Sequence, residues 1–93
     1  MKVENMTSSN GNKIANQFII TDQNKTVFQS YDTVIAKKTI LCDTTKPVHV
    51  ELDRDSWDCS KTTGKYRNIF LGESKKETEK KIKSGVYILA DLN

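Results

Sequence analysis

The sequence is poor in the residue types from which metal sites and catalytic centres are commonly built. Its 93 residues include one histidine, His49, and two cysteines, Cys42 and Cys59. The cysteines are too far apart for a CxxC motif, and with one histidine they cannot complete a four-ligand zinc site without carboxylates. We therefore expect two reduced, structural thiols and neither a metal nor another cofactor.

Long hydrophobic runs are also absent. No stretch of the sequence approaches the roughly 18 consecutive apolar residues of a membrane-spanning helix. Residues 1–13 are polar and do not have the character of a secretory signal. With 35% hydrophobic and 29% charged residues, the composition is typical of one small soluble domain. We expect this domain to reside in a cytoplasm and to have no membrane partner.

Charge is present but unevenly distributed. The formal net charge is only +3, yet residues 42–58 hold five acids against two bases, and residues 60–83 hold eight bases against three acids. Such an asymmetry says more about binding than the total does, because one face of a small domain can be basic while the whole is nearly neutral. The sequence therefore predicts a basic face formed by its C-terminal half.

Alternation of apolar and polar residues with a period of two indicates β-strands before residue 54. In residues 48–53, valine and leucine alternate with histidine and acidic residues. Turn-forming segments, the last of them residues 43–47, separate the apolar runs and favour an antiparallel meander. Lys37-Lys38 interrupts one run and predicts a bulge or an exposed edge. The predicted strands are residues 17–21, 26–31, 33–42 and 48–53.

Helix signals follow in the second half of the chain. An apolar stripe with helical spacing predicts a first helix that is capped by Thr62 or Thr63 and ends at Leu71, before a glycine suited to the C-terminal cap. Ser74 and Glu77 form a capping box, which starts a second helix that runs to about residue 84. Few apolar residues occur in the second helix, so most of it should face water.

Together these patterns predict the α+β class. The apolar residues 86–89 add a last strand or an extended tail, and residues 1–13 have almost no apolar side chains. We therefore expect a disordered N-terminal arm over residues 1–13 and a single small α+β domain over residues 14–93. The expected domain has an antiparallel four- to five-stranded sheet and two short C-terminal helices.

No catalytic motif is complete. Residues 63–65 (Thr-Gly-Lys) resemble part of a phosphate-binding loop, but Cys59 and Tyr66 replace the glycine and the hydroxyl residue that this loop requires. His49 and Glu51 share a face of a predicted strand, where a histidine–carboxylate pair could move protons, but no nucleophile is identifiable beside them. We therefore expect a protein that is not an enzyme.

The basic residues of the C-terminal half are the candidate binding residues. The segment from Trp57 to Gly72 mixes aromatic, hydroxyl and basic side chains in a way that a packed core does not need. Basic groups among aromatic ones suit nucleic acids, and they equally suit protein interfaces. Alternatively, Trp57 and Tyr66 belong to the core and the lysines form an ordinary solvated face; the composition leaves this open, as it does the oligomeric state. The candidate partner-binding residues are Lys61, Lys65, Arg67, Lys75, Lys76 and Lys80.

A resemblance to a known family is carried mainly by the segment that begins at Trp57. With residues 28–36 and 83–89, this segment resembles a family of small proteins of unknown function that occur in phages and mobile elements of bacteria. The resemblance covers roughly residues 16–92 and implies no known activity or catalytic residue. The segment reads Trp57, Ser60, Thr62-Thr63, Lys65-Tyr66-Arg67-Asn68 and Phe70-Leu71-Gly72.

The resemblance implies a context of conflict between phage and bacterial host. Small phage proteins without catalytic equipment often act by occupying the surface of a host machine. We therefore expect a non-enzymatic inhibitor in the host cytoplasm that binds a host protein, such as a CRISPR or other defence effector. The alternative that the residues leave open is an accessory protein that binds nucleic acid directly.

Overall fold

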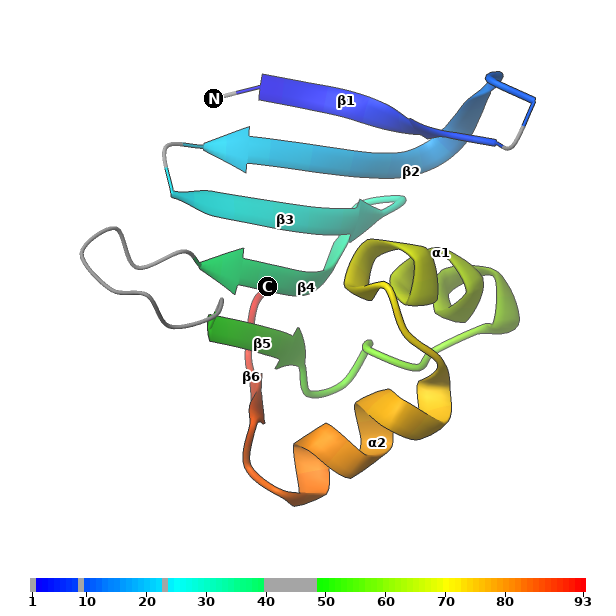
Figure 1. Ribbon diagram of the computed structural model, residues 1–93. Helices are drawn as coiled ribbons and strands as arrows, with labels where there is room; N and C mark the ends of the chain where they lie inside the picture. Colours follow the sequence, from blue (N-terminus) through cyan, green and yellow to red (C-terminus); the bar gives the residue numbers. More distant parts are fainter. Residues whose placement is uncertain (1, 9, 23, 40–48) are drawn as a thin grey trace.

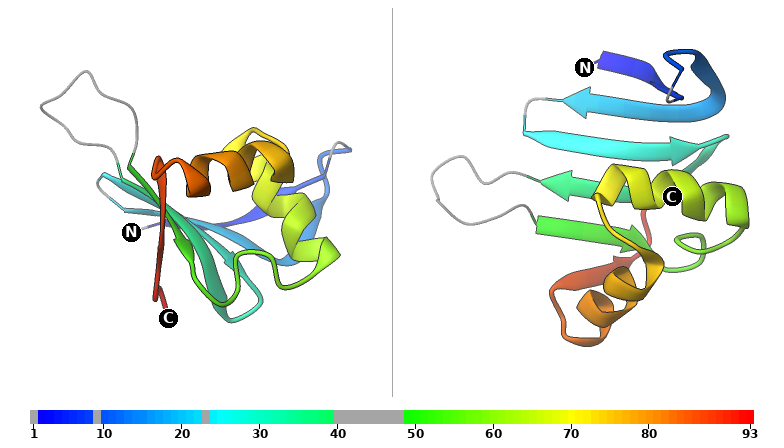
Figure 2. Two further views of the ribbon diagram at one scale, coloured as in Figure 1. Left: turned by 90° about the horizontal axis from the view of Figure 1, so that it is seen from below. Right: turned by 45° about the vertical axis from the view of Figure 1, so that its right-hand side comes forward.

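Two helices lie on one face of a twisted six-stranded sheet (Figures 1 and 2). The computed structural model describes residues 2–8, 10–22, 24–39 and 49–93, and this architecture is formed by those residues. It confirms the α+β class and the single small domain that the sequence predicts. The helices come late in the chain, as expected, between the fifth and sixth strands.

The strands follow one another across the sheet in chain order. The first five pair as an antiparallel meander, whereas the sixth pairs in parallel with the fifth because both helices intervene between them. The sheet therefore has one strand more than predicted and one parallel pair; the turn predicted at residues 43–47 lies outside the described residues. The strands are β1 (Lys2–Thr7), β2 (Lys13–Asp22), β3 (Lys25–Ser30), β4 (Thr33–Thr39), β5 (His49–Asp53) and β6 (Tyr87–Ala90).

The N-terminal segment corrects the sequence prediction. The disordered arm predicted over residues 1–13 is wrong for Lys2–Thr7, which forms the edge strand β1 in antiparallel pairing with β2. An edge strand is held by backbone hydrogen bonds and needs few apolar side chains, so its composition resembles that of an arm. Met6 is the side chain of β1 that is buried in the core.

The helices begin where the capping residues allow. Helix α1 (Lys61–Leu71) is capped by Ser60 and not by Thr62 or Thr63: the Ser60 hydroxyl accepts a hydrogen bond of 3.1 Å from the backbone N–H of Thr63. The Thr63 hydroxyl is instead buried and lies 3.2 Å from the hydroxyl of Ser30 on β3. Gly72 has the left-handed conformation, with φ of 71°, that ends α1 as predicted.

Helix α2 (Lys75–Lys83) starts with the predicted capping box of Ser74 and Glu77. The residue between the two helices, Glu73, fixes α2 on the sheet, because its carboxylate accepts hydrogen bonds from the Tyr87 hydroxyl, the Lys81 ammonium and the Thr78 hydroxyl. Burial alone would raise the pKa of Glu73, but these three donors outweigh it and hold the pKa below its ordinary value of 4.5.

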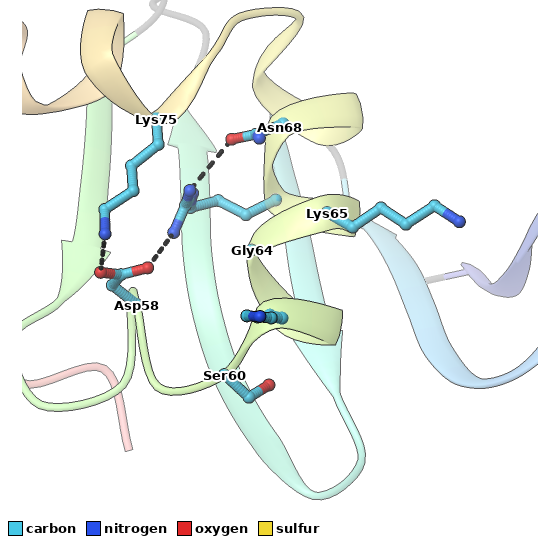
Figure 3. A pocket seen from close by; sticks show the side chains of 8 residues that line it. Asp58, Ser60, Gly64, Lys65, Asn68 and Lys75 are labelled. Atoms are coloured by element: carbon cyan, nitrogen blue, oxygen red, sulfur yellow. Dashed lines mark hydrogen bonds and ion pairs between the residues drawn. The ribbon is translucent and has the colours of Figure 1, made fainter.

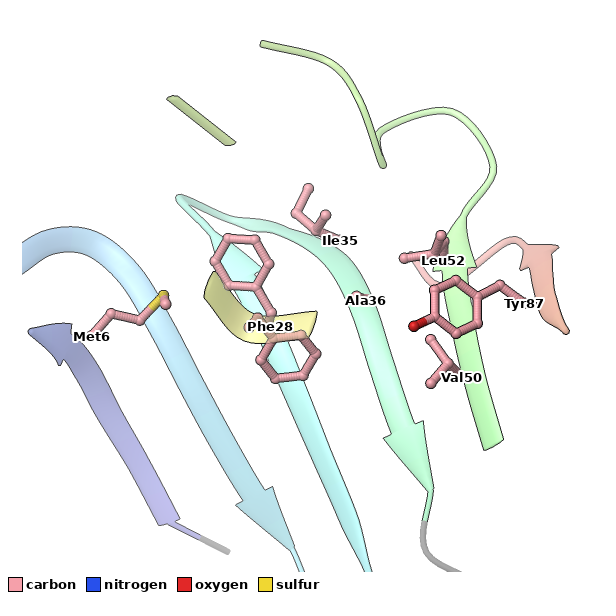
Figure 4. Packing of buried hydrophobic residues seen from close by; sticks show 8 residues of the cluster. Met6, Phe28, Ile35, Ala36, Val50, Leu52 and Tyr87 are labelled. Atoms are coloured by element: carbon pink, nitrogen blue, oxygen red, sulfur yellow. The ribbon is translucent and has the colours of Figure 1, made fainter. Parts of the chain in front are cut away.

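The core lies between the helices and the central strands (Figure 4). Phe28, Ile35 and Leu52 are fully buried, and the rings of Phe28 and Phe70 pack with centroids 5.8 Å apart. A register shift opposite Phe28 makes Ile35 an extra residue in β4. The bulge predicted at Lys37-Lys38 is therefore two residues too late, and these lysines lie in an interior strand that is paired on both sides, not at an edge.

Candidate functional site

An open pocket of about 590 Å³ lies beside the first turns of α1, where the loop after β5 and the start of α2 also meet (Figure 3). We call it the cationic pocket, because four of the six candidate residues line it together with a single carboxylate. Its wall on the α1 side includes Gly64, which leaves room that a longer side chain would fill. The lining residues are Asp58, Ser60, Lys61, Gly64, Lys65, Arg67, Asn68 and Lys75.

Arg67 corrects the sequence prediction of an exposed contact residue. Its side chain is only 1% exposed, and one guanidinium nitrogen, Nη1, donates hydrogen bonds to the backbone oxygen of Trp57 (2.7 Å) and to Oδ1 of Asp58 (3.2 Å). The other nitrogen, Nη2, donates to Oδ1 of Asn68 at 3.0 Å, and the guanidinium carbon lies 5.2 Å from the Trp57 ring centre. Arg67 therefore ties the loop before α1 to the helix from within and closes the back of the pocket.

Asp58 is the pocket residue that sequence reasoning missed. Its carboxylate bridges the two helices, with Oδ1 on Arg67 and Oδ2 2.7 Å from the Lys75 ammonium (Figure 3). Burial would raise the pKa of Asp58, but the hydrogen bonds from Lys75 and Arg67 outweigh it and hold the pKa below its ordinary value of 3.8. The hydrogen bond to Asp58 in turn raises the pKa of Lys75. No sequence signal announces this bridge, because its members come from a loop and two different helices.

The remaining candidate lysines divide into two groups. Lys61 and Lys65 line the cationic pocket and are exposed, and Lys65 points away from Asp58 (Figure 3). Lys76 and Lys80 are also exposed on α2 but do not line the pocket. None of these four lysines forms an ion pair within the described part of the chain. The structure therefore brings Lys61, Lys65, Arg67 and Lys75 together and leaves Lys76 and Lys80 outside the pocket.

The two aromatic residues of this region belong partly to the core. Trp57 and Tyr66 are half-buried and pack against the buried cluster, so both alternatives left open by the sequence hold in part. Tyr66 still offers its ring to the surface, where the ammonium of Lys65 lies 5.5 Å from the ring centre. The two lysines of α1 thus stand on a surface that is not purely polar.

The other chemistry-bearing residues do not converge. His49 Nε2 lies 3.8 Å from a Glu51 carboxylate that Lys37 also contacts at 3.3 Å. Cys59 is an exposed free thiol, and Cys42 lies outside the described residues. Across residues 2–8, 10–22, 24–39 and 49–93, no group of histidine, cysteine and acidic residues has a metal-binding arrangement. In the same ranges, no helix has the length and apolar character needed to cross a membrane.

Fold and site together define a small α+β protein with a cationic pocket beside its first helix. The chain belongs to a family of unknown function (DUF8033), whose model matches residues 1–85. Membership of an uncharacterised family agrees with the resemblance drawn from the sequence. No curated protein and no solved structure matches the chain.

Proposed function

We propose that the protein is a non-enzymatic binding protein that docks on an acidic surface of a protein partner through the lysines of the cationic pocket. The observation that carries this proposal is the placement of Lys61 and Lys65. Both are exposed, they stand four residues apart on one side of α1, and neither has an acidic partner among the described residues. Their charges are therefore available to a partner, whereas those of Arg67 and Lys75 are engaged by Asp58.

The arrangement is unfavourable for the helix itself, which supports a role in binding. Like charges four residues apart destabilise a helix by roughly 0.2–0.5 kcal/mol, and lysine at the first position opposes the positive end of the helix dipole. The first turn of α1 contains no acidic residue that would compensate. By contrast, α2 has Glu77 in its first turn and lysines in its last. Local rules are most often broken at functional sites.

The partner that we propose is a bacterial defence nuclease or its effector complex, so that the protein would act in the host cytoplasm as an inhibitor of the anti-CRISPR kind. The resemblance to phage and mobile-element proteins supports this choice. Electrostatic attraction between the lysines and an acidic patch would speed the encounter and orient the partner.

A capture experiment from bacterial lysate tests the proposal. Immobilised wild-type protein should retain a defence component, and the variant Lys61→Glu with Lys65→Glu should retain at least tenfold less. The variant Lys76→Glu with Lys80→Glu makes the same change of charge outside the pocket and should lose no more than about threefold. The proposal is wrong if the pocket variant captures the same partner as well as the wild type does.

Direct binding of nucleic acid is the second candidate, favoured by the four cations that line one pocket. The test is anisotropy with single-stranded and duplex DNA and RNA 20-mers at several salt concentrations. About four phosphate contacts predict a log–log slope with salt near −3 to −4. Micromolar or tighter affinity at roughly 150 mM salt would favour this candidate, since non-specific binding is typically weaker. Absence of binding at low salt would remove it.

A further inference from the structure

The exposed side of α1 continues past the lysines to an apolar residue. Ile69 follows Lys65 by four residues, as Lys65 follows Lys61, so the three side chains stand on one side of the helix. Ile69 is 57% exposed although it is large and apolar. The stripe thus changes from positive to apolar along the helix.

Ile69 stands between two further hollows on the surface. One, of about 430 Å³, lies between α1 and the β1–β2 pair and has Met6 and Ile19 in its wall. The other, of about 200 Å³, has Ile14 and Tyr66 in its wall. We call the two together the α1 groove, which has an apolar lining of Met6, Ile14, Ile19, Tyr66 and Ile69.

The groove is continuous with the cationic pocket. Its two hollows share Thr7 and Ile69, and the smaller hollow shares Lys65 with the pocket. At the far end of the groove, Glu4 lines the larger hollow and pairs with Lys2 at 2.8 Å. One surface therefore runs from a positive end at the start of α1, through an apolar middle, to an acidic residue on β1.

The fold explains why this apolar surface is uncovered. Helix α1 lies over the middle of the sheet, and the β1–β2 end extends beyond it on the same face (Figures 1 and 2). Ile19 of β2 is paired with the core residue Phe28 of β3, so both side chains are on the helix-covered face. The apolar layer of the core thus continues past α1 to a region that no other described element covers.

We propose that the cationic pocket and the α1 groove form one docking surface for a segment of a protein partner that has a large apolar side chain flanked by carboxylates. The apolar side chain sits beside Ile69, and the carboxylates contact Lys61 and Lys65. This inference deepens the proposed function, from which it takes the two lysines as the acidic partner's contacts. Protein interfaces combine an apolar centre with a charged rim, whereas phosphate backbones make no use of an isoleucine.

The helix geometry sets the spacing of the partner's residues. With a rise of about 1.5 Å per residue, Lys65 is about 6 Å and Lys61 about 12 Å from Ile69 along the axis. An extended segment advances about 3.3 Å per residue. Its carboxylates should therefore lie about two to four residues from its apolar anchor. They should lie on one side of that anchor only, because Glu4 repels acids at the other end of the groove.

A displayed library of random dodecapeptides tests the surface and does not require that the partner be identified first. Selection on immobilised wild-type protein, after depletion on the Ile69→Glu variant, should enrich peptides with aspartate or glutamate at that spacing from a large apolar residue. Selected peptides should bind the Ile69→Glu and Lys65→Glu variants at least tenfold more weakly in an anisotropy titration. Because both residues are exposed, circular dichroism and melting temperature should stay close to those of the wild type.

Val86 provides the matched control. It is apolar and 60% exposed but lines neither the groove nor the pocket, so Val86→Glu should change peptide affinity by less than twofold. The inference is overturned if no peptide is enriched or if Ile69→Glu binds the selected peptides as well as wild type does. Binding of a nucleic-acid 20-mer that depends on Lys65 but not on Ile69, without peptide enrichment, would overturn it as well.

The inference and the proposed function fail separately. If the Lys61→Glu, Lys65→Glu variant loses a captured partner while Ile69→Glu affects neither capture nor peptide binding, the proposed function stands and the inference is overturned. If no partner is captured, but library peptides bind with dependence on both Ile69 and Lys65, the inference is supported and the proposed function fails.

Discussion

Replacement of Arg67 by methionine should destabilise the protein by about 3 kcal/mol. The substitution keeps most of the aliphatic stem but removes the donors to the Trp57 carbonyl, the Asp58 carboxylate and the Asn68 side chain. Loss of one partner of a buried ion pair costs about 3–5 kcal/mol. We expect the lower end of that range, because Asp58 is 32% exposed and keeps its contact with Lys75.

Urea denaturation measures this loss directly, since Trp57 is the single tryptophan of the chain and contacts Arg67. Far-UV circular dichroism provides an independent probe of the same transition. At about 4–8 °C per kcal/mol for a chain of this size, the melting temperature should fall by about 12–24 °C. Arg67→Lys retains the charge but only one short donor group, and should lose about 2 kcal/mol.

The matched control is Lys76→Met, which makes a similar change at an exposed lysine outside the pocket and should stay within about 0.5 kcal/mol of wild type. A loss below about 1 kcal/mol for Arg67→Met would refute the reasoning. It would mean that water or rearrangement satisfies the groups that Arg67 contacts, and that the loop before α1 does not depend on this side chain.

Three further outcomes are expected. Because the folded-state pKa values of Asp58 and Glu73 lie below 3.8 and 4.5, their contribution to stability is complete above about pH 4.5 and is lost as pH falls through the lower folded-state values; urea midpoints measured from pH 7 to pH 3 should show this, and Asp58→Asn with Glu73→Gln should flatten the dependence. Gly64→Ala should stabilise the protein by about 0.5–1 kcal/mol, because the added Cβ would lie at an ordinary contact distance of 3.6 Å from Arg67 Nη2; a lower melting temperature would contradict this, and partner capture by this stable variant would report on the space in the pocket. Ser60→Ala should cost about 1 kcal/mol by removal of the N-terminal cap of α1, whereas an unchanged midpoint would show that the cap contributes nothing.

Local patterns predict much of the fold. The alternation in residues 48–53 finds β5, and the pairing of Ser74 with Glu77 finds the start of α2, because strand periodicity and capping depend on residues that are close in sequence. The same local rules fail where two solutions compete. Thr63 is a good candidate cap for α1, but its hydroxyl is used across the core by Ser30, so the cap falls to Ser60.

The site is less predictable, because its geometry depends on distant partners. The sequence shows that Arg67 is basic but not that a loop folds back to offer it the Trp57 carbonyl and the Asp58 carboxylate. Burial of a charged side chain is a property of the assembled elements and not of its neighbours in sequence. The predicted exposure of Lys61 and Lys65 is correct, since solvent exposure is the usual state of a lysine without a buried partner.

The parallel pairing of β6 with β5 has a consequence for the order of folding. The meander from β1 to β5 joins segments that are close in sequence, whereas Val50 of β5 meets Tyr87 of β6 only after both helices have been spanned. Closure of so long a loop costs chain entropy before any contact is gained, so we expect β6 to join after the meander has formed. The cationic pocket is built from residues inside that loop, from Asp58 to Lys75. A binding-competent surface should therefore be among the last features that the folding chain acquires.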